Sequence, residues 1–206
     1  MPSAMERAKL ARVAFALNAS SVLPPLILMT DEKRLRDPAA AARALPRGAA
    51  IILRHTMPDT RRFLAQALIR IAHERGLLLL IAGDAALAAR IGADGLHLPE
   101  TRVSEAMHWK AAHPSWLITA AAHSERALAC AARAGADAAL LAPAFPTLSH
   151  AERPSLGVTR LRLMAARAAL PVYALGGVNA RTAQRLAGAR LAGIAAIDGL
   201  MVDQSS

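Results

Sequence analysis

Side chains that can bind anions or move protons follow several short apolar runs of this sequence, at the points where the runs end. Arg54 and His55 follow one run, and Asp84 follows the next. Charged and polar side chains at such positions are candidates for a binding or catalytic site, although loops after strands are polar on average. The spacing predicts one site assembled from several loops. The polar residues that follow other runs include Thr30, Asp31, Glu100, Arg102, His123, Ser124, Thr147, Ser149, His150 and Asp198.

A pair of glycines stands at the end of another apolar run. Gly176 and Gly177 follow that run, and Asn179 can cap a helix after them. Glycines let the backbone approach a ligand closely, and exposed N–H groups there attract anions. The pair therefore predicts a phosphate-binding seat, with a tight turn that binds nothing as the alternative.

Two histidines are candidates for acid/base chemistry, because histidine titrates near neutral pH. His97 lies within an apolar run and His123 directly follows another. The alternative for each is a hydrogen-bonded structural histidine. The single cysteine, Cys130, falls in an expected helix over 127–134, which favours a buried structural thiol over a nucleophile.

The elements that must position these residues are strands and helices in regular alternation. Near-continuous apolar runs separated by amphipathic stretches are typical of a parallel sheet with both faces covered. One such stretch, 60–75, predicts a helix that buries Phe63, Leu64, Ala67, Leu68 and Ile71 on one face. The eight predicted strands cover 25–29, 49–53, 77–82, 95–98, 116–121, 138–142, 172–175 and 194–197.

An internal repeat indicates how these units assemble. Residues 89–98 match residues 132–141, and each copy reads as a helix end, a glycine cap and a strand. We therefore expect an α/β fold, a single (β/α)8 barrel domain over 1–206. A doubly wound open sheet has less support, because no Gly-x-Gly-x-x-Gly follows the first strand. A long loop over 143–157 is expected to act as a lid.

The two ends of the chain should share one wall of the barrel. Residues 1–18 have helical periodicity, which predicts an extra N-terminal helix and not a signal peptide. Only 198–206 follow the last predicted strand, so the last helix must be truncated or missing. We expect the N-terminal helix, or a partner subunit of a homo-oligomer, to cover that wall.

Composition excludes several classes of protein. The formal net charge of +10 comes almost entirely from arginines spread along the chain, and aromatic residues make up only 3%. Without a basic cluster or stacking residues, specific nucleic-acid binding is not expected. No apolar run is long enough to span a membrane. A cytoplasmic location is the expectation that follows, while the small phosphorylated substrate is predicted from the glycine pair.

The ordered set of motifs resembles the thiamine phosphate synthases and their thiazole tautomerase relatives. This family joins a pyrimidine pyrophosphate to a thiazole phosphate with Mg2+, through a carbocation-like pyrimidine. The resemblance implies Arg54 on the pyrophosphate, Asp84 on the metal, Thr147 and Ser149 near the phosphates, and Gly176 with Gly177 on the thiazole phosphate. It rests on Met29-Thr-Asp31, Ile52-Leu-Arg54, Gly83-Asp84, Gly92 to Leu98, Ala122-His-Ser124, Ala142 to Thr147 and Leu175-Gly-Gly177.

Departures from the family pattern fall mostly on its pyrophosphate and metal residues. Arg102 stands where a second metal carboxylate is expected, although Glu100 is close by, and Asp198 replaces a serine near the phosphate. Pro143 stands where the tautomerases carry a histidine, so that activity is not supported. The other replacements are Ile52 and Thr56 for the Gln and Lys of Gln-x-Arg-x-Lys, Gly83 for an Asn, Ala121 for a serine, and Thr147-Leu-Ser-His150 for Thr-x-Thr-Lys.

Three hypotheses for function follow. The first is a transferase of the thiamine phosphate synthase type, with Arg54, His97 and His123 as catalytic residues, and with Mg2+ held by Asp84 and Glu100. Its substrate would contact His55, Thr147, Ser149, His150, Gly176 and Gly177. The second is a non-catalytic or regulatory binder of a thiamine-pathway phosphate. The third is a barrel isomerase acting on a related phosphorylated ligand, on fold analogy alone.

Overall fold

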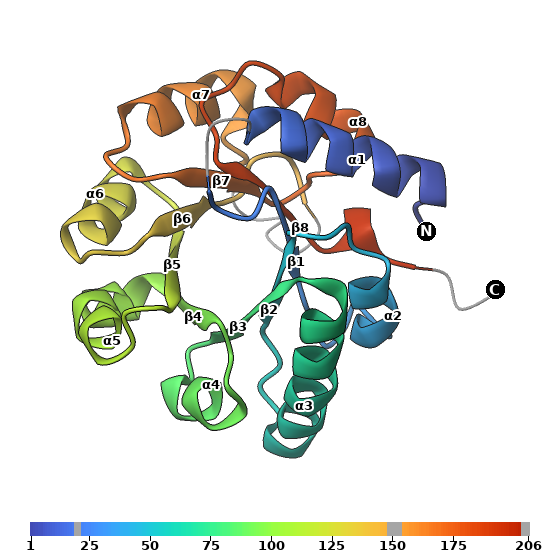
Figure 1. Cartoon of the computed structure of the whole chain (residues 1–206). Helices are drawn as coiled ribbons and strands as arrows, with labels where there is room; N and C mark the ends of the chain where they lie inside the picture. Colours follow the sequence, from blue (N-terminus) through green and yellow to red (C-terminus); the bar gives the residue numbers. More distant parts are fainter. Residues whose placement is uncertain (19–21, 148–153, 203–206) are drawn as a thin grey trace.

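The strands of the chain close into a barrel. The structure is a computed structural model that describes residues 1–18, 22–147 and 154–202. Its strands pair in parallel and in chain order, and β8 pairs with β1 to complete the ring seen in Figure 1. The predicted barrel is confirmed. The strands are β1 (Leu26–Met29), β2 (Ala50–Leu53), β3 (Leu78–Ala82), β4 (Gly95–Leu98), β5 (Leu117–Ala122), β6 (Ala138–Leu141), β7 (Val172–Leu175) and β8 (Gly193–Ala196).

Helices surround the barrel, as expected for apolar strands that need cover on their outer face. The α-helices are α1 (Ala4–Leu17), α2 (Pro38–Arg43), α3 (Pro58–Arg75), α4 (Ala85–Ile91), α5 (Ala106–Ala112), α6 (Glu125–Arg133), α7 (Gly157–Arg167) and α8 (Ala180–Ala183). The described residues also form the short 3-10 helices η1 (Glu100–Glu105), η3 (Gln184–Leu186) and η4 (Asp198–Leu200). None of the described helices is both long and apolar enough to cross a membrane.

The N-terminal helix covers the wall that the short last unit leaves open. After β8 the described residues contain only η4, and α1 packs against β1, β8, α8 and η4. Figure 1 shows α1 lying beside α8. Leu10 and Ala14 of α1 are fully buried, while Ser3 and Glu6 form a capping box that fixes where α1 begins. The expected extra helix is confirmed, and α1 provides this cover within one chain.

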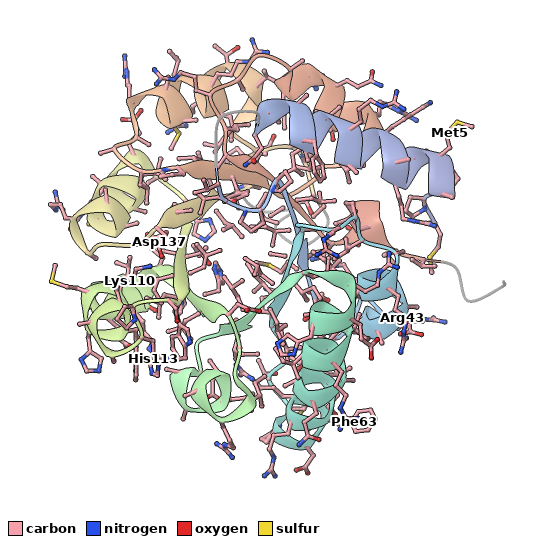
Figure 2. The ribbon with its side chains drawn as sticks, viewed as in Figure 1. Met5, Arg43, Phe63, Lys110, His113 and Asp137 are labelled. Atoms are coloured by element: carbon pink, nitrogen blue, oxygen red, sulfur yellow. The ribbon has the colours of Figure 1, made fainter. Side chains whose placement is uncertain are left out.

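The internal repeat, residues 89–98 and 132–141, forms the junction between a helix and the strand that follows it. These junctions lie at the end of the barrel where the strands begin. Gly92 and Gly135 take positive φ angles of 68° and 80°, as the cap positions require. The aspartates that follow, Asp94 and Asp137, each accept a hydrogen bond from the backbone of a neighbouring strand, at 2.8 and 2.7 Å. Asp137 also pairs with Lys110 at 3.0 Å, and both side chains are labelled in Figure 2. The repeat thus joins each helix to the barrel.

Two expectations about burial were wrong. Phe63 projects from α3 toward solvent and is 73% exposed (Figure 2). The buried face of α3 instead centres on Ala65, Leu68 and Ala72, about one residue further round the helix. Cys130 is only half-buried, since α6 turns its neighbours Ala127 and Ala131 inward.

Candidate active site

A cavity of about 880 Å³ opens at the carboxyl ends of the strands, where barrel enzymes place their sites. Residues from every strand or from the loop after it contribute to its lining. The lining residues with polar side chains are Arg34, Arg54, His97, His123, Thr147, Asn179, Arg181, Thr182 and Asp198, together with Glu6 of α1.

Arg54 lines this cavity directly after β2, as predicted. Its backbone N–H donates to the Thr30 hydroxyl at 2.9 Å, and its guanidinium pairs with the Asp31 carboxylate. Asp31 also accepts from the Arg34 guanidinium at 3.4 Å. Burial opposes the ionisation of Asp31, but the hydrogen bonds from Arg34 outweigh it and lower the pKa of that carboxyl. One carboxylate therefore holds two guanidinium groups at the cavity.

His55, which was predicted to contact the substrate, does not line the cavity. It is 5% exposed, is not among the residues that line the cavity, and shares a hydrogen bond of 3.0 Å between Nδ1 and the Thr30 hydroxyl. Burial lowers its pKa. Because Thr30 also accepts from the Arg54 backbone, His55 helps to hold Arg54 in position.

His97 reaches the cavity from the middle of the barrel wall. Its side chain is buried, and Nδ1 lies 2.9 Å from the Thr119 hydroxyl on the neighbouring strand β5. Burial, with a smaller contribution from the charge of Arg54, lowers the pKa of His97 to about 4. At neutral pH this imidazole is therefore uncharged, and it can offer a ligand a hydrogen bond but no positive charge.

The low pKa of His97 predicts a pH-dependent contribution to stability. An unfolded histidine takes up its proton near pH 6.5, and the folded one only near pH 4, so stability is complete above 6.5 and falls as pH decreases between these values. The free energy of unfolding should fall by about 1 kcal/mol per pH unit in this window. Urea unfolding of wild type and His97→Gln from pH 4 to 7 measures the difference.

The exposed His73 of α3 provides the control for this titration. His73→Gln should keep the wild-type pH dependence, whereas His97→Gln should lose the component that belongs to His97. Equal slopes for wild type and His97→Gln below pH 6.5 would show that His97 titrates normally.

His123 lines the cavity just beyond β5. Its Nδ1 lies 2.9 Å from the carbonyl oxygen of Ala142, on the neighbouring strand's loop. Because a carbonyl oxygen can only accept, Nδ1 carries a proton, and the ring orientation is set by this contact. The structure therefore places His123 at the cavity, as predicted, and next to the loop after β6.

The two glycines after β7 lie against the start of the β6 loop. Gly176 and Gly177 line the cavity with positive φ angles of 92° and 64°. A Cβ on Gly177 would stand 2.5 Å from the Pro146 carbonyl oxygen, so only glycine fits there. Within the described part of the chain, no group accepts a hydrogen bond from the N–H of Gly177 or Val178. These donors suit an anion, and Thr147 lines the same cavity.

Asp198 stands at the cavity after β8, but its charge is not isolated. Its carboxylate accepts from the Arg34 guanidinium at 3.1 Å, while its side chain remains 60% exposed. The Arg34 charge therefore offsets part of the repulsion that the Asp198 carboxylate would exert on a phosphate in the cavity. The ion pairs connect Asp198, Arg34, Asp31 and Arg54 in one row.

The predicted magnesium ligands are used elsewhere. Asp84 caps α4 by accepting from the Leu87 N–H at 2.9 Å, and Glu100 accepts from the His123 N–H at 3.1 Å. Neither lines the cavity. Among residues 1–18, 22–147 and 154–202, no three His, Cys, Asp or Glu side chains gather closely enough to hold a metal ion. These residues do not fit a magnesium ion as the resemblance implied.

Two arginines that line the cavity, Arg34 and Arg181, were not identified from the sequence. Arg34 lies in a charged stretch after β1 and Arg181 in the first turn of α8, and both line the cavity. Each of them follows a strand, β1 or β7, and this position in the sequence could have identified them. Ser149 and His150 lie outside the described residues.

Comparison with known proteins gives consistent matches. The sequence profile of a family described as thiamine monophosphate synthase matches residues 26–200. The thiamine-phosphate synthase of Chlorobium luteolum is 34% identical over 188 residues, which cover 88% of this chain and 87% of that protein. The thiamine-phosphate synthase of Nitrosococcus oceani is 33% identical over 165 residues, covering 78% of this chain and 76% of that protein.

A solved structure supports the same fold. Thiamine phosphate pyrophosphorylase from Pyrococcus furiosus superimposes with a TM-score of 0.69 at 22% identity, covering 93% of this chain and 87% of that one. At this identity the likeness shows the fold alone.

Proposed function

The chain belongs to the thiamine monophosphate synthase family, and from this membership we propose that it is a transferase that joins a pyrimidine pyrophosphate to a thiazole phosphate. In this reaction the thiazole nitrogen forms a bond to the pyrimidine methylene carbon, while the bond from that carbon to pyrophosphate breaks. Pyrophosphate leaves with the electron pair. The observation that carries the proposal is a single cavity with anion-binding groups on two sides, Arg54 after β2 and Gly176–Gly177 after β7.

The β7 side suits the phosphate of the thiazole substrate. The backbone N–H groups of Gly177 and Val178 have no acceptor within the described residues, and they come from a turn held by the β6 loop. Backbone donors fixed in this way bind a phosphate without loss of side-chain entropy. We assign Thr147 to the same phosphate because it lines the cavity beside this turn.

The β1 and β2 side suits the pyrophosphate that must leave. Arg54 and Arg34 both line the cavity, and both are oriented by Asp31. Guanidinium groups stabilise the negative charge that develops on a leaving group and so lower the barrier to its departure. The reaction needs no strong base, and a neutral His97 between these two sides is compatible with contact to an uncharged ring.

Removing the Asp198 charge should improve phosphate binding, because this carboxylate competes for Arg34. We expect Asp198→Asn to bind inorganic phosphate about threefold more tightly at low salt. Calorimetric titration in low-salt buffer measures the change. Asp59→Asn is the matched control, since Asp59 pairs with Arg62 on the exposed surface of α3. Weaker binding by Asp198→Asn would mean that Asp198 orients Arg34 for the ligand.

A second candidate function is non-catalytic binding of a phosphate from the same pathway. It is favoured by the use of Asp84 and Glu100 in structural contacts, which leaves the cavity without the expected metal ligands. The two functions differ in one result. Incubation with both substrates should yield thiamine phosphate, detected by chromatography, if the chain is a transferase. Calorimetric binding of thiazole phosphate without any product, with a known synthase active alongside, would establish the binder and refute the transferase.

A further inference from the structure

The wall of the cavity after β3 has arginines directly behind it. Ala82 and Gly83 line the cavity, and their carbonyl oxygens both accept hydrogen bonds from guanidinium groups. Arg61 of α3 donates to Ala82, and Arg102 of η1 donates to Gly83 at 2.8 Å. Carbonyl oxygens of this kind can bind a cation, but these two already accept from guanidinium groups. Two positive charges lie close to where such a cation would stand.

The carboxylates near this wall are also engaged. Both oxygens of Glu105 accept from Arg102, at 2.6 and 2.7 Å. One oxygen of Asp84 accepts from the backbone of α4, and the charge of Asp84 acts on Arg102. Magnesium needs oxygen ligands and is repelled by neighbouring cations. The wall therefore leaves a divalent cation few free oxygen ligands and places two guanidinium groups beside it.

The same region has an excess of hydrogen-bond donors. The buried Nε of Arg61 has no hydrogen-bond partner among the described residues. On the cavity side, Arg54 is 44% exposed, and among the described residues its guanidinium pairs through one nitrogen with Asp31. A pyrophosphate group carries several negative charges and many acceptor oxygens, which match the guanidinium donors that Arg54 presents to the cavity.

We propose that this chain binds the pyrophosphate group of its substrate without a protein-held divalent cation, with Arg61 and Arg102 supplying the positive field behind the β3 wall and Arg54 making the direct contact. The identity of the substrate that carries this group rests on the proposed function. Binding of inorganic pyrophosphate itself does not, so the two can be tested separately.

The test is calorimetric titration of the purified chain with inorganic pyrophosphate, in EDTA and in excess Mg2+. We expect binding in EDTA. Because Mg2+ binds pyrophosphate in water and lowers its charge, we expect Mg2+ to weaken binding. Electron paramagnetic resonance of Mn2+ added to the protein alone should show only the free ion. A tenfold gain in pyrophosphate affinity with Mg2+, or Mn2+ bound at one per chain, would overturn the proposal, whether or not the chain forms thiamine phosphate.

Variants at Arg102 test the electrostatic effect of its charge separately from the direct contact that Arg54 makes with pyrophosphate. Arg102→Met should weaken metal-free pyrophosphate binding about fivefold, because a charge several ångströms away is lost. Arg102→Lys keeps the charge and should retain most of the affinity, which separates charge from packing. Arg62→Met is the matched control on the exposed surface of α3 and should bind as wild type. Unchanged affinity in a folded Arg102→Met, checked by circular dichroism, would contradict the proposed field.

Discussion

Replacing Arg54 with methionine is expected to reduce kcat/KM for thiamine phosphate formation about a hundredfold, the usual effect of losing one donor to a developing charge. Methionine keeps much of the length of the side chain and removes the guanidinium. Arg54 lines the cavity, its backbone is fixed by Thr30 and its guanidinium is oriented by Asp31. Since negative charge increases on the pyrophosphate oxygen as its bond to carbon breaks, the contact with Arg54 should strengthen in the transition state, and most of the loss should appear in kcat. Steady-state kinetics with both substrates varied measures it.

Arg62→Met is the control for this prediction. Arg62 lies on α3, 61% exposed and paired with Asp59, so its loss changes the net charge by the same amount away from the cavity. Its kinetics should match those of wild type. A loss of less than threefold in Arg54→Met would remove Arg54 from the reaction and favour another cavity arginine, Arg34 or Arg181, as the principal contact.

The second large effect is expected from Gly177→Ala. The backbone there has a φ of 64°, and the new methyl would lie 2.5 Å from the Pro146 carbonyl oxygen and 2.9 Å from the Phe145 carbonyl carbon. The β6 loop would have to move, and the seat for the thiazole phosphate would move with it. We expect the free energy of unfolding to fall by about 3 kcal/mol. Thiazole phosphate affinity, measured by calorimetry, should fall at least about tenfold, since an ordered donor pair is displaced.

Gly188→Ala separates the two causes of this effect. Gly188 also has a positive φ, 76°, but a Cβ there meets nothing within 4 Å. The Gly188→Ala variant should therefore lose only about 1 kcal/mol of the free energy of unfolding, the cost of a side chain at this backbone conformation. Its affinity for thiazole phosphate should be unchanged. Should Gly177→Ala behave like Gly188→Ala in both measurements, the close approach of the β6 loop would have no part in binding.

The sequence predicted most of the fold because its signals were local and repeated. Apolar runs marked each strand to within one or two residues, and the Gly-Ala-Asp corners recur where Gly92 and Gly135 end their helices. The face of α3 was placed incorrectly because Phe63 is a large apolar residue that nonetheless points to solvent. Hydrophobic periodicity assumes that such residues are buried, and a helix on the outside of a barrel does not require it.

The site was predicted less completely, since its chemistry depends on which atoms meet across loops. Arg54, His97, His123, Thr147 and the glycine pair all line the cavity. In contrast, Asp84 and Glu100 are polar residues after strands whose oxygens are used by backbone donors. His55 turns inward to Thr30, and Arg34 turns toward the cavity. No pattern in one sequence distinguishes a carboxylate that caps a helix from one that binds a metal.

The most direct test of the proposed transfer is a time course followed by phosphorus nuclear magnetic resonance, with both substrates at saturation, in Mg2+ and in EDTA. If the chain is the proposed transferase, the signals of thiamine phosphate and pyrophosphate should grow together in equal amounts, and Arg54→Met should slow both equally. Substrate signals that stay unchanged, while a known synthase completes the reaction beside it, would contradict the transferase. Pyrophosphate released without thiamine phosphate would mean hydrolysis, and would contradict it as well.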